Sequence, residues 1–340
     1  MPLKTRDEYL DGLRRLGHRV FLQGEAVKDV VDHPVSRPAA LAMAETYQAA
    51  AEPATKALLA TTSHLTGAPV NRFAHIHQGT DDLVRKILML REMGRRTASC
   101  FQRCAGLDCL NTLYAVTFDI DRKHATAYHA RFVAYLRHIQ EGDLIPAACM
   151  TDPKGDRSLS PAEQRDRDQY LRVVERRADG IVVRGAKLHI TGAINSHELL
   201  VVPTRALRED EKDYAVAFAV PATASGVTFV YGRQPSDTRR LEAGRADVGN
   251  VYFGGCEALV VFDDVFVPEE RVFMCGEFDM AGRLVECFAA HHRASYGGCK
   301  VGVGDVLIGA TAAIAEVQGV DKAAHVRDKL AEMVHLNETM

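Results

Sequence analysis

The sequence predicts an α+β fold in which a helical unit is followed by an antiparallel β unit and then by a second helical unit. Up to residue 145, apolar residues recur with the period of a helix. Between residues 146 and 276, short runs rich in Val, Ile, Phe and Thr alternate with Gly, Asp and Asn, which is typical of strands and turns. Helical periodicity returns from residue 277. We therefore expect three domains, formed by residues 1–145, 146–276 and 277–340.

The first unit contains four segments with helical periodicity, which are residues 6–16, 39–51, 81–94 and 123–141. Pro34 and Pro38 separate the first two, because the residue before a proline is disfavoured in helical backbone. Thr80 precedes two acidic residues and is predicted to cap the third helix, whose N-terminal dipole favours negative charge.

The second unit contains five predicted strands, which are residues 180–190, 198–203, 214–220, 227–231 and 258–262. Residues 166–177 are rich in charge and are predicted to form a solvated face or a loop and not a site. In the third unit, helices are expected at residues 305–315 and 323–335, and the chain reaches Met340 without a capping signal.

The composition and net charge of the chain limit the classes of protein to which it can belong. Hydrophobic residues make up 47% of the 340 residues and charged residues 26%, and the formal net charge is −3. This charge gives no electrostatic reason to expect nucleic acid or an anionic membrane as a partner. The N-terminal segment lacks an apolar signal core, and no uninterrupted apolar run approaches the roughly 20 residues that span a bilayer. We therefore expect a cytoplasmic protein.

Two groups of residues have the spacing of ligands. Cys100 and Cys104 are four residues apart, so a helix would place both sulfurs on one face. A second segment shows the same periodicity, with residues spaced at i, i+4, i+7 and i+8: His292, Tyr296, Cys299 and Lys300.

Three thiolates and an imidazole suit either a zinc ion or an iron–sulfur cluster. A buried core is the alternative, because cysteine is among the most buried residue types. A disulfide framework is not expected in a chain of this size without a signal peptide. The other cysteines show no comparable pairing and are expected to be structural: Cys109, Cys149, Cys256, Cys275 and Cys287.

Three further stretches combine hydroxyls, glycine and Lys or Arg near the ends of predicted strands: residues 150–157, 183–198 and 254–268. Such groups supply hydrogen-bond donors for a flavin ring and positive charge for its pyrophosphate. Three β-turns with ordinary turn chemistry are the alternative interpretation.

Six blocks in the same order resemble the family of 4-hydroxybutyryl-CoA dehydratases, which have the acyl-CoA dehydrogenase fold: residues 71–73, 97–104, 150–157, 185–198, 254–267 and 296–305. Residues 31–34 are similar to the wider 4-hydroxyphenylacetate 3-hydroxylase-like family. The resemblance runs over the whole chain. It implies an N-terminal helical domain, a flavin-binding β domain and the start of a C-terminal helical bundle.

The resemblance also implies the residues of a site. The ligands of a 4Fe-4S cluster would be Cys100, Cys104, His292 and Cys299, and the spacing His-x3-Tyr-x2-Cys-Lys selects His292 over His291. The implied catalytic residues are His292, Tyr296, Lys300 and Glu257. Gln102 would flank the cluster and Thr191 would lie near the flavin ring. The remaining contacts to FAD would come from Thr151, Lys154, Gly155, Asp156, Arg157, Asn195, Ser196 and His197.

The implied activity is radical dehydration of 4-hydroxybutyryl-CoA to crotonyl-CoA, with vinylacetyl-CoA Δ-isomerase activity, in a homotetramer. FAD would serve one-electron chemistry, and His292 would serve as a base. Two alternatives stay open: a reduced-flavin aromatic hydroxylase of the 4-hydroxyphenylacetate 3-monooxygenase type, and a non-catalytic protein in which zinc joins the two helical units. Family members continue beyond the position of Met340, so we expect a fragment or a fold completed by a neighbouring chain.

Overall fold

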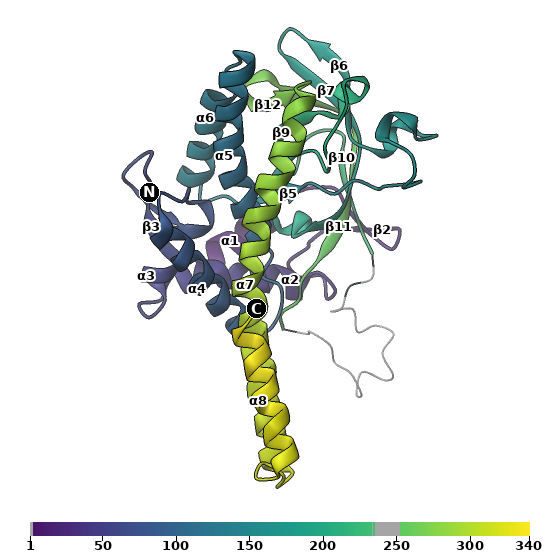
Figure 1. Cartoon of the computed structure of the whole chain (residues 1–340). Helices are drawn as coiled ribbons and strands as arrows, with labels where there is room; N and C mark the ends of the chain where they lie inside the picture. The colour runs from purple at the N-terminus through teal and green to yellow at the C-terminus, as the bar shows by residue number, and fades with distance from the viewer. Residues whose placement is uncertain (1–2, 233, 235–251) are drawn as a thin grey trace.

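Helices α1 to α6 form the first unit of the protein, in a computed structural model that describes residues 3–232, 234 and 252–340. α1 begins with a capping box, in which the Thr5 side chain accepts from the Glu8 backbone and Glu8 accepts from the Thr5 backbone. α5 lies between α6 and α7, so most of its surface is buried (Figure 1). The helices are α1 (Arg6–Arg14), α2 (Arg37–Ala51), α3 (Lys56–Leu59), α4 (Thr80–Thr97), α5 (Cys104–His124) and α6 (Tyr128–Glu141).

The middle unit contains a six-stranded sheet in the order β2-β1-β10-β11-β7-β6 and a four-stranded sheet in the order β12-β9-β8-β5. Phe262 of β11 meets Phe218 of β9 with ring centroids 6.0 Å apart, so apolar side chains of the two sheets share a core. The strands are β1 (Val20–Leu22), β2 (Glu25–Val27), β5 (Pro146–Cys149), β6 (Arg172–Arg177), β7 (Gly180–Thr191), β8 (Glu198–Val201), β9 (Val216–Pro221), β10 (Val227–Tyr231), β11 (Glu257–Pro268) and β12 (Val272–Cys275). β3 (Ala60–Thr62) and β4 (Pro69–Asn71) form a separate pair.

The α+β class is confirmed, but the middle unit is not purely antiparallel. β1 pairs with β10 in parallel, and β5 pairs with β8 in parallel. β1 comes from the first 22 residues of the chain, so it reaches the large sheet from the helical unit. The proposed domain limits at residues 145 and 276 therefore stay a prediction.

Two local predictions were wrong. Residues 123–141 are not one helix, because Ala125 adopts a left-handed φ of 54° that ends α5 before α6 begins. Thr80 is the first helical residue of α4 and not its cap, which is Gly79. Within the charge-rich segment, residues 172–177 form the edge strand β6, whose charged side chains make a solvated face while its backbone pairs with β7.

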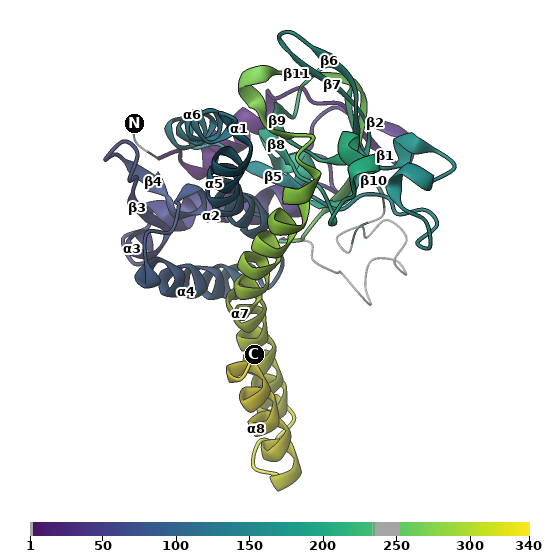
Figure 2. The same ribbon diagram turned by 45° about the horizontal axis from the view of Figure 1, so that its top comes forward.

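Two helices complete the described chain: α7 (Phe278–Val317) and α8 (Ala324–Glu338). The second half of α7 and the whole of α8 project from the body as an antiparallel pair (Figures 1 and 2). Asp305 of α7 ties this pair to α4, because its carboxylate accepts from Arg91 at 2.8 Å and Arg95 at 2.6 Å. Asn337 of α8 donates to the same carboxylate at 2.9 Å.

By length and composition, α7 is apolar enough to cross a membrane, with a mean hydropathy of 1.4 over its most apolar 18-residue window. A single helix of this kind is weak evidence, because core helices of other proteins pass the same test. Its first half packs against α4 and α5. We therefore interpret α7 as part of the helical unit.

Glycines allow α7 to cross α4 with the two backbones in contact. A Cβ atom at Gly298 would lie 2.6 Å from the carbonyl oxygen of Ile87, and one at Gly302 would lie 2.1 Å from that of Arg91. A Cβ atom at Gly94 of α4 would lie 2.6 Å from the carbonyl oxygen of Cys299. Gly297 and Gly298 lie inside one continuous α7 although glycine has a low helix propensity.

Gly302→Ala is expected to destabilise the protein by roughly 1–3 kcal/mol, because the new methyl group has to displace helix backbone. The matched control is Gly297→Ala on the same helix, where a Cβ atom has nothing within 4 Å. Alanine has the higher helix propensity, so this control should leave stability unchanged or raise it by up to about 1 kcal/mol. Urea unfolding of both variants checks the prediction, which equal midpoints for the two would contradict.

Candidate functional site

Cys100 and Cys104 lie where α4 passes into α5, on two different elements. Ala98 ends α4 with a left-handed φ of 48°, Cys100 lies in the following loop, and Cys104 is the first residue of α5. The expectation that one helical face carries both sulfurs was therefore wrong. The two thiols are nevertheless near each other. Their proximity is evident in the pKa of Cys104, which the charge of Cys100 raises.

The second group lies on α7, as the spacing predicted. The ring of His292 stacks on Phe288 at 5.3 Å and meets the edge of Tyr296 at 5.0 Å. The Lys300 ammonium lies 5.5 Å from the centre of the Tyr296 ring. These side chains follow one another at one-turn intervals and form a continuous row along the helix.

The two groups meet where α7 crosses the start of α5. A hydrogen bond from the Cys104 thiol lowers the pKa of Cys299 to about 7, and the charges of Lys300 and His292 act in the same direction. The same hydrogen bond, together with burial, raises the pKa of Cys104. Cys100 opens onto a cavity, but the surrounding protein desolvates its sulfur and raises the pKa of the thiol. Cys299 is thus the thiol poised to ionise near neutral pH.

Within the residues that the structure describes, no group of three or more His, Cys, Asp or Glu side chains lies close enough to hold a single metal ion. The sulfurs and the imidazole are therefore neighbours without forming a tetrahedral pocket. This finding gives no support to the zinc alternative, which needs four ligands about 2.0–2.3 Å from one ion.

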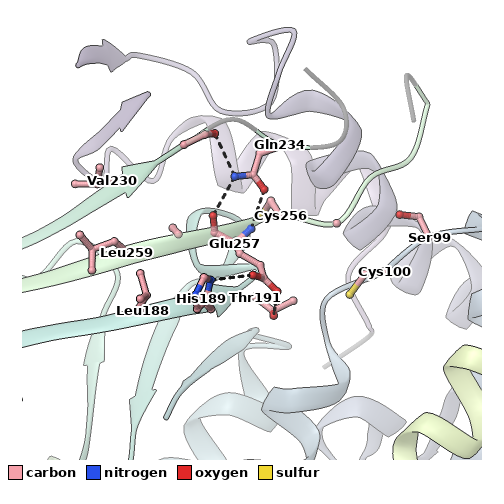
Figure 3. Close-up of a pocket in the computed structure, with 13 residues that line it drawn as sticks. Ser99, Cys100, Leu188, His189, Thr191, Val230, Gln234, Cys256, Glu257 and Leu259 are labelled. Atoms are coloured by element: carbon pink, nitrogen blue, oxygen red, sulfur yellow. Dashed lines mark hydrogen bonds and ion pairs between the residues drawn. The ribbon is translucent and has the colours of Figure 1, made fainter. Parts of the chain in front are cut away.

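A cavity of about 670 Å³ lies between the large sheet and the loop that carries Cys100. Figure 3 shows Ser99 and Cys100 at one end of it and Val230 and Leu259 at the other. Its size falls within the range of about 300–1,000 Å³ for small-molecule sites. The lining also includes Leu188, His189, Thr191, Gln234, Gly255, Cys256, Glu257 and Ala258.

Polar groups from β7 and β11 converge on one wall of this cavity. Thr191 Oγ1 donates to the Glu257 carboxylate at 3.5 Å, and His189 Nδ1 lies 3.4 Å from the same carboxylate. His189 has a left-handed φ of 58° at a bulge, where β7 has an extra residue opposite β11. The side-chain amide of Gln234 makes two hydrogen bonds to the backbone of Glu257. Its Nε2 donates to the Glu257 carbonyl oxygen and its Oε1 accepts from the Glu257 N–H, both at 3.2 Å.

The predicted FAD turn, residues 151–157, begins beside β7, where Leu188 N donates to Thr151 O at 2.7 Å. Gly155 adopts a left-handed φ of 52°, and Asp156 lines a second cavity with residues 164–169. Thr151, Lys154 and Arg157 do not line the 670 Å³ cavity. Their contact with FAD stays a prediction.

Four other predicted site residues have polar groups that contact protein, and three of them are buried: Gln102, Asn195 and Ser196. Gln102 donates to Ala39 O at 2.8 Å, and its carbonyl accepts from Asn195 at 3.0 Å. Ser196 donates to Gly192 O at 2.8 Å. The ring of His197 accepts from the Ile145 backbone at 3.0 Å, and burial lowers its pKa to about 3. These contacts give the four residues a role in the fold, and their contact with FAD or the cluster stays a prediction.

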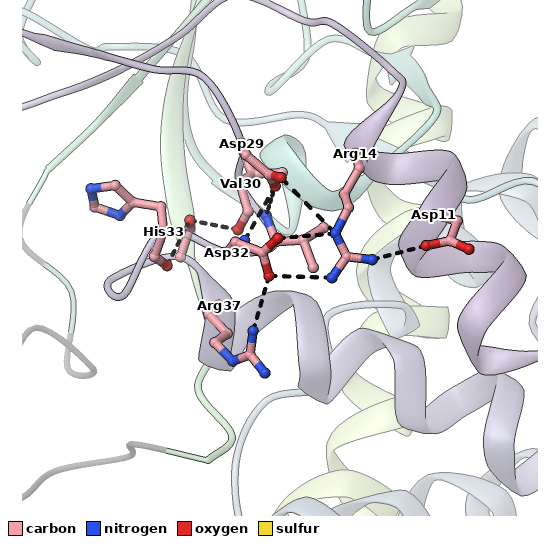
Figure 4. A network of polar contacts seen from close by, with 9 residues as sticks. Asp11, Arg14, Asp29, Val30, Asp32, His33 and Arg37 are labelled. Atoms are coloured by element: carbon pink, nitrogen blue, oxygen red, sulfur yellow. Dashed lines mark hydrogen bonds and ion pairs between the residues drawn. The ribbon is translucent and has the colours of Figure 1, made fainter.

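The motif at residues 31–34 forms a surface network that joins the end of α1 to the start of α2 (Figure 4). The Asp32 carboxylate accepts from Arg14 Nε at 3.1 Å and from Arg37 Nη1 at 3.0 Å. Hydrogen bonding from Arg14 is the main cause that lowers the pKa of Asp32. Asp29 caps the turn by accepting from Val31 N at 2.8 Å. The visible role of this motif is therefore structural.

Sequence reasoning missed three residues of the site. His189 and Gln234 line the cavity, and Asp108 contacts the His292 ring at 2.8 Å. His189 lies at a bulge two residues before Thr191, and the bulge breaks the alternation of side chains by which a strand pattern could have found it. No sequence pattern pointed to Asp108 or Gln234, because each is far in the sequence from the residue that it contacts.

Family models account for nearly the whole chain. Residues 5–274 match the N-terminal and residues 281–340 the C-terminal model of 4-hydroxyphenylacetate 3-hydroxylase. The chain therefore belongs to the 4-hydroxyphenylacetate 3-hydroxylase family. Within it, the chain is 55% identical to the 4-hydroxybutyryl-CoA dehydratase/vinylacetyl-CoA-Δ-isomerase of Clostridium aminobutyricum, over 99% of this chain and 69% of that protein.

Solved structures agree with this placement. The chain superposes with a TM-score of 0.95 on an oxygen-tolerant archaeal 4-hydroxybutyryl-CoA dehydratase from N. maritimus, at 49% identity over 99% of this chain and 67% of that one. It also superposes on the oxygenase component of 4-hydroxyphenylacetate 3-monooxygenase complexed with FAD, with a TM-score of 0.83, at 25% identity over 98% of this chain and 69% of that one. The acyl-CoA dehydrogenase-like fold that the sequence implied is confirmed.

Proposed function

We propose that this chain dehydrates 4-hydroxybutyryl-CoA to crotonyl-CoA, and isomerises vinylacetyl-CoA, with FAD and a 4Fe-4S cluster. One observation carries the proposal: thiols from the α4–α5 loop, from the start of α5 and from α7 lie together beside a cavity lined by Thr191 and Glu257. Identity of 55% to a dehydratase over 99% of the chain supports the same reaction.

The donor set suits an iron–sulfur cluster. Thiolates are the common ligands of such clusters, and an imidazole replaces thiolate in some of them. Each ligand of a cluster binds a different iron, so the ligands lie farther apart than around a single ion. Among the described residues, the cysteine and histidine side chains are neighbours but do not converge on the position of a single ion, which fits this requirement. Cys100, Cys104, His292 and Cys299 would hold the cluster.

The cavity suits a flavin ring. Its lining combines apolar strand residues with the Thr191 hydroxyl and the His189 imidazole, which supply hydrogen bonds to ring oxygens and nitrogens. A family relative binds FAD with the same overall fold. Because Cys100 lines this cavity and also interacts electrostatically with Cys299, a flavin held here would lie beside the cluster ligands.

Conversion of 4-hydroxybutyryl-CoA to crotonyl-CoA removes a proton next to the thioester, an unactivated hydrogen on the neighbouring carbon and the 4-hydroxyl. One hydrogen returns to the 4-carbon, so a single water is lost overall. When bound, FAD supplies one-electron chemistry and the cluster supplies a Lewis acid. Because its Nδ1 is already hydrogen-bonded to Asp108, His292 would accept a proton at Nε2, and only when that atom is not bound to iron. Lys300 and Tyr296 would donate hydrogen bonds to substrate oxygens, and Glu257 would orient Thr191 toward the flavin.

The test is anaerobic reconstitution with iron, sulfide and FAD, followed by a crotonyl-CoA assay with 4-hydroxybutyryl-CoA. The expected result is a broad iron–sulfur absorption on top of a flavin spectrum, together with turnover. His292→Cys should keep iron yet abolish dehydration, because cysteine ligates but is not placed to act as this base. Full activity of that variant would refute the assignment of His292.

Two results would replace the proposal. A flavoprotein without iron that hydroxylates 4-hydroxyphenylacetate, given reduced flavin and oxygen, would be a monooxygenase like the relative of known structure. A colourless chain that contains only zinc would be a structural protein. A homotetramer and a cytoplasmic location are part of the proposal, and light scattering of the reconstituted chain measures the first.

A further inference from the structure

A buried carboxylate on α5 contacts the ring of His292. Asp108 is fully buried, and its Oδ2 lies 2.8 Å from His292 Nδ1. An ionised carboxylate only accepts hydrogen bonds, so Nδ1 carries the proton and donates it. The Nε2 atom is then the ring nitrogen with a free lone pair.

Two other groups fix Asp108 in place independently of His292. Lys86 Nζ donates to Oδ1 at 2.6 Å, and Lys86 is itself held by the carbonyl oxygen of His291 at 2.9 Å. Ser295 Oγ lies 3.0 Å and 2.8 Å from the two carboxylate oxygens. Lys86 is as buried as Asp108, so the two charges compensate each other. The carboxylate is a rigid anchor and not a mobile surface group.

The same contacts give the two adjacent histidines, His291 and His292, different surroundings. The His291 ring lies against His77, with centroids 5.8 Å apart, and its backbone carbonyl supports Lys86. The His292 ring is on the row with Tyr296, which continues along α7 to Lys300. The choice between the two histidines is therefore made by tertiary contacts, which spacing alone does not contain.

We propose that Asp108 is a positioning residue that holds His292 in the Nδ1–H tautomer and presents its Nε2 atom to iron. The inference rests on the proposed function, because it gives His292 the role of a cluster ligand. Histidine ligands commonly donate their other ring N–H to a carboxylate, which fixes tautomer and orientation. Here Lys86 and Ser295 hold that carboxylate, so the imidazole is oriented before any metal binds.

The first measurement uses the metal-free full chain, in which ¹⁵N-histidine NMR reports the tautomer of each ring. His292 is identified by the loss of its signal in His292→Gln. We expect a single Nδ1–H tautomer in the wild type. Asp108→Asn leaves Lys86 unpaired and has the risk of unfolding, so the decisive variant is the double substitution Lys86→Met/Asp108→Leu, which fills the same space with apolar groups. Its His292 should populate both tautomers.

The second measurement is iron binding after anaerobic reconstitution. The double variant should bind the cluster about 10–100-fold more weakly than the wild type, as is typical when the partner of a histidine ligand is removed. Ser295→Ala is the matched control, because it removes a contact to Asp108 but leaves the bond between Asp108 and His292. It should keep the Nδ1–H tautomer.

The outcomes separate this inference from the proposed function. A double variant with an unchanged tautomer and unchanged cluster affinity overturns the positioning role while leaving the dehydratase proposal in place. A wild-type chain that binds no iron under these conditions overturns both. A double variant whose His292 populates both tautomers and that binds iron more weakly supports both proposals. Loss of packing alone would not change which ring nitrogen carries the proton.

Discussion

Cys299→Ala is expected to abolish the iron–sulfur absorption of the reconstituted chain and to reduce its iron from about four per chain to a small fraction of that value. In the proposed cluster, Cys299 of α7 would add a thiolate to those of Cys100 in the α4–α5 loop and Cys104 at the start of α5. Its loss would therefore remove a link between the helical units. Its pKa of about 7 also makes it the readiest of the three to bind metal at neutral pH. Iron and sulfide assays with visible spectra measure the effect.

The control for this experiment is Cys287→Ala on the same helix. Cys287 lies three turns before Cys299, and its thiol is hydrogen-bonded to Thr112. Its removal should leave iron content and absorption at the wild-type level. If Cys299→Ala retained the full iron content, or if both variants lost it equally, Cys299 would not be a ligand.

The sequence predicted the class of fold and most elements that have a clear period. α1, α2 and α4 begin within two residues of the expected segments, and β10 matches residues 227–231. α5 was missed over most of its length because it is buried between α6 and α7 and so lacks one apolar stripe. β1 and β2 were missed because each has three residues, and pairing partners more than 200 residues away in the chain define β1.

The candidate site was predicted unevenly for a related reason. Spacing along α7 identified His292, Tyr296 and Lys300 as one row, and the structure confirms the row. Spacing failed at Cys100, because a left-handed residue ends α4 and puts that thiol in a loop. Contacts between α5 and α7, such as those of Asp108, depend on tertiary packing, and a single sequence carries no signal for them.

Lys187→Met is expected to destabilise the protein by about 3–5 kcal/mol, the typical cost of leaving one partner of a buried ion pair alone. Lys187 Nζ lies 2.9 Å from Asp152, and both side chains are at most 4% exposed. The ammonium also donates to the carbonyl oxygens of Met150 and Val202 at 2.9 Å, so its loss orphans two acceptors as well. Burial already raises the pKa of Asp152, and without Lys187 the carboxyl should become protonated.

This ion pair also links stability to the proposed flavin site, because Asp152 belongs to the turn of residues 151–157 and Lys187 to β7. Lys187→Met should therefore weaken FAD binding, measured by fluorescence titration, in parallel with a lower urea midpoint. The double variant Lys187→Met/Asp152→Leu removes both charges, and apolar replacement of a whole buried pair is often neutral. It should recover most of the lost stability but not the geometry of the turn. A single variant as stable as the wild type would show that this pair contributes nothing to the fold.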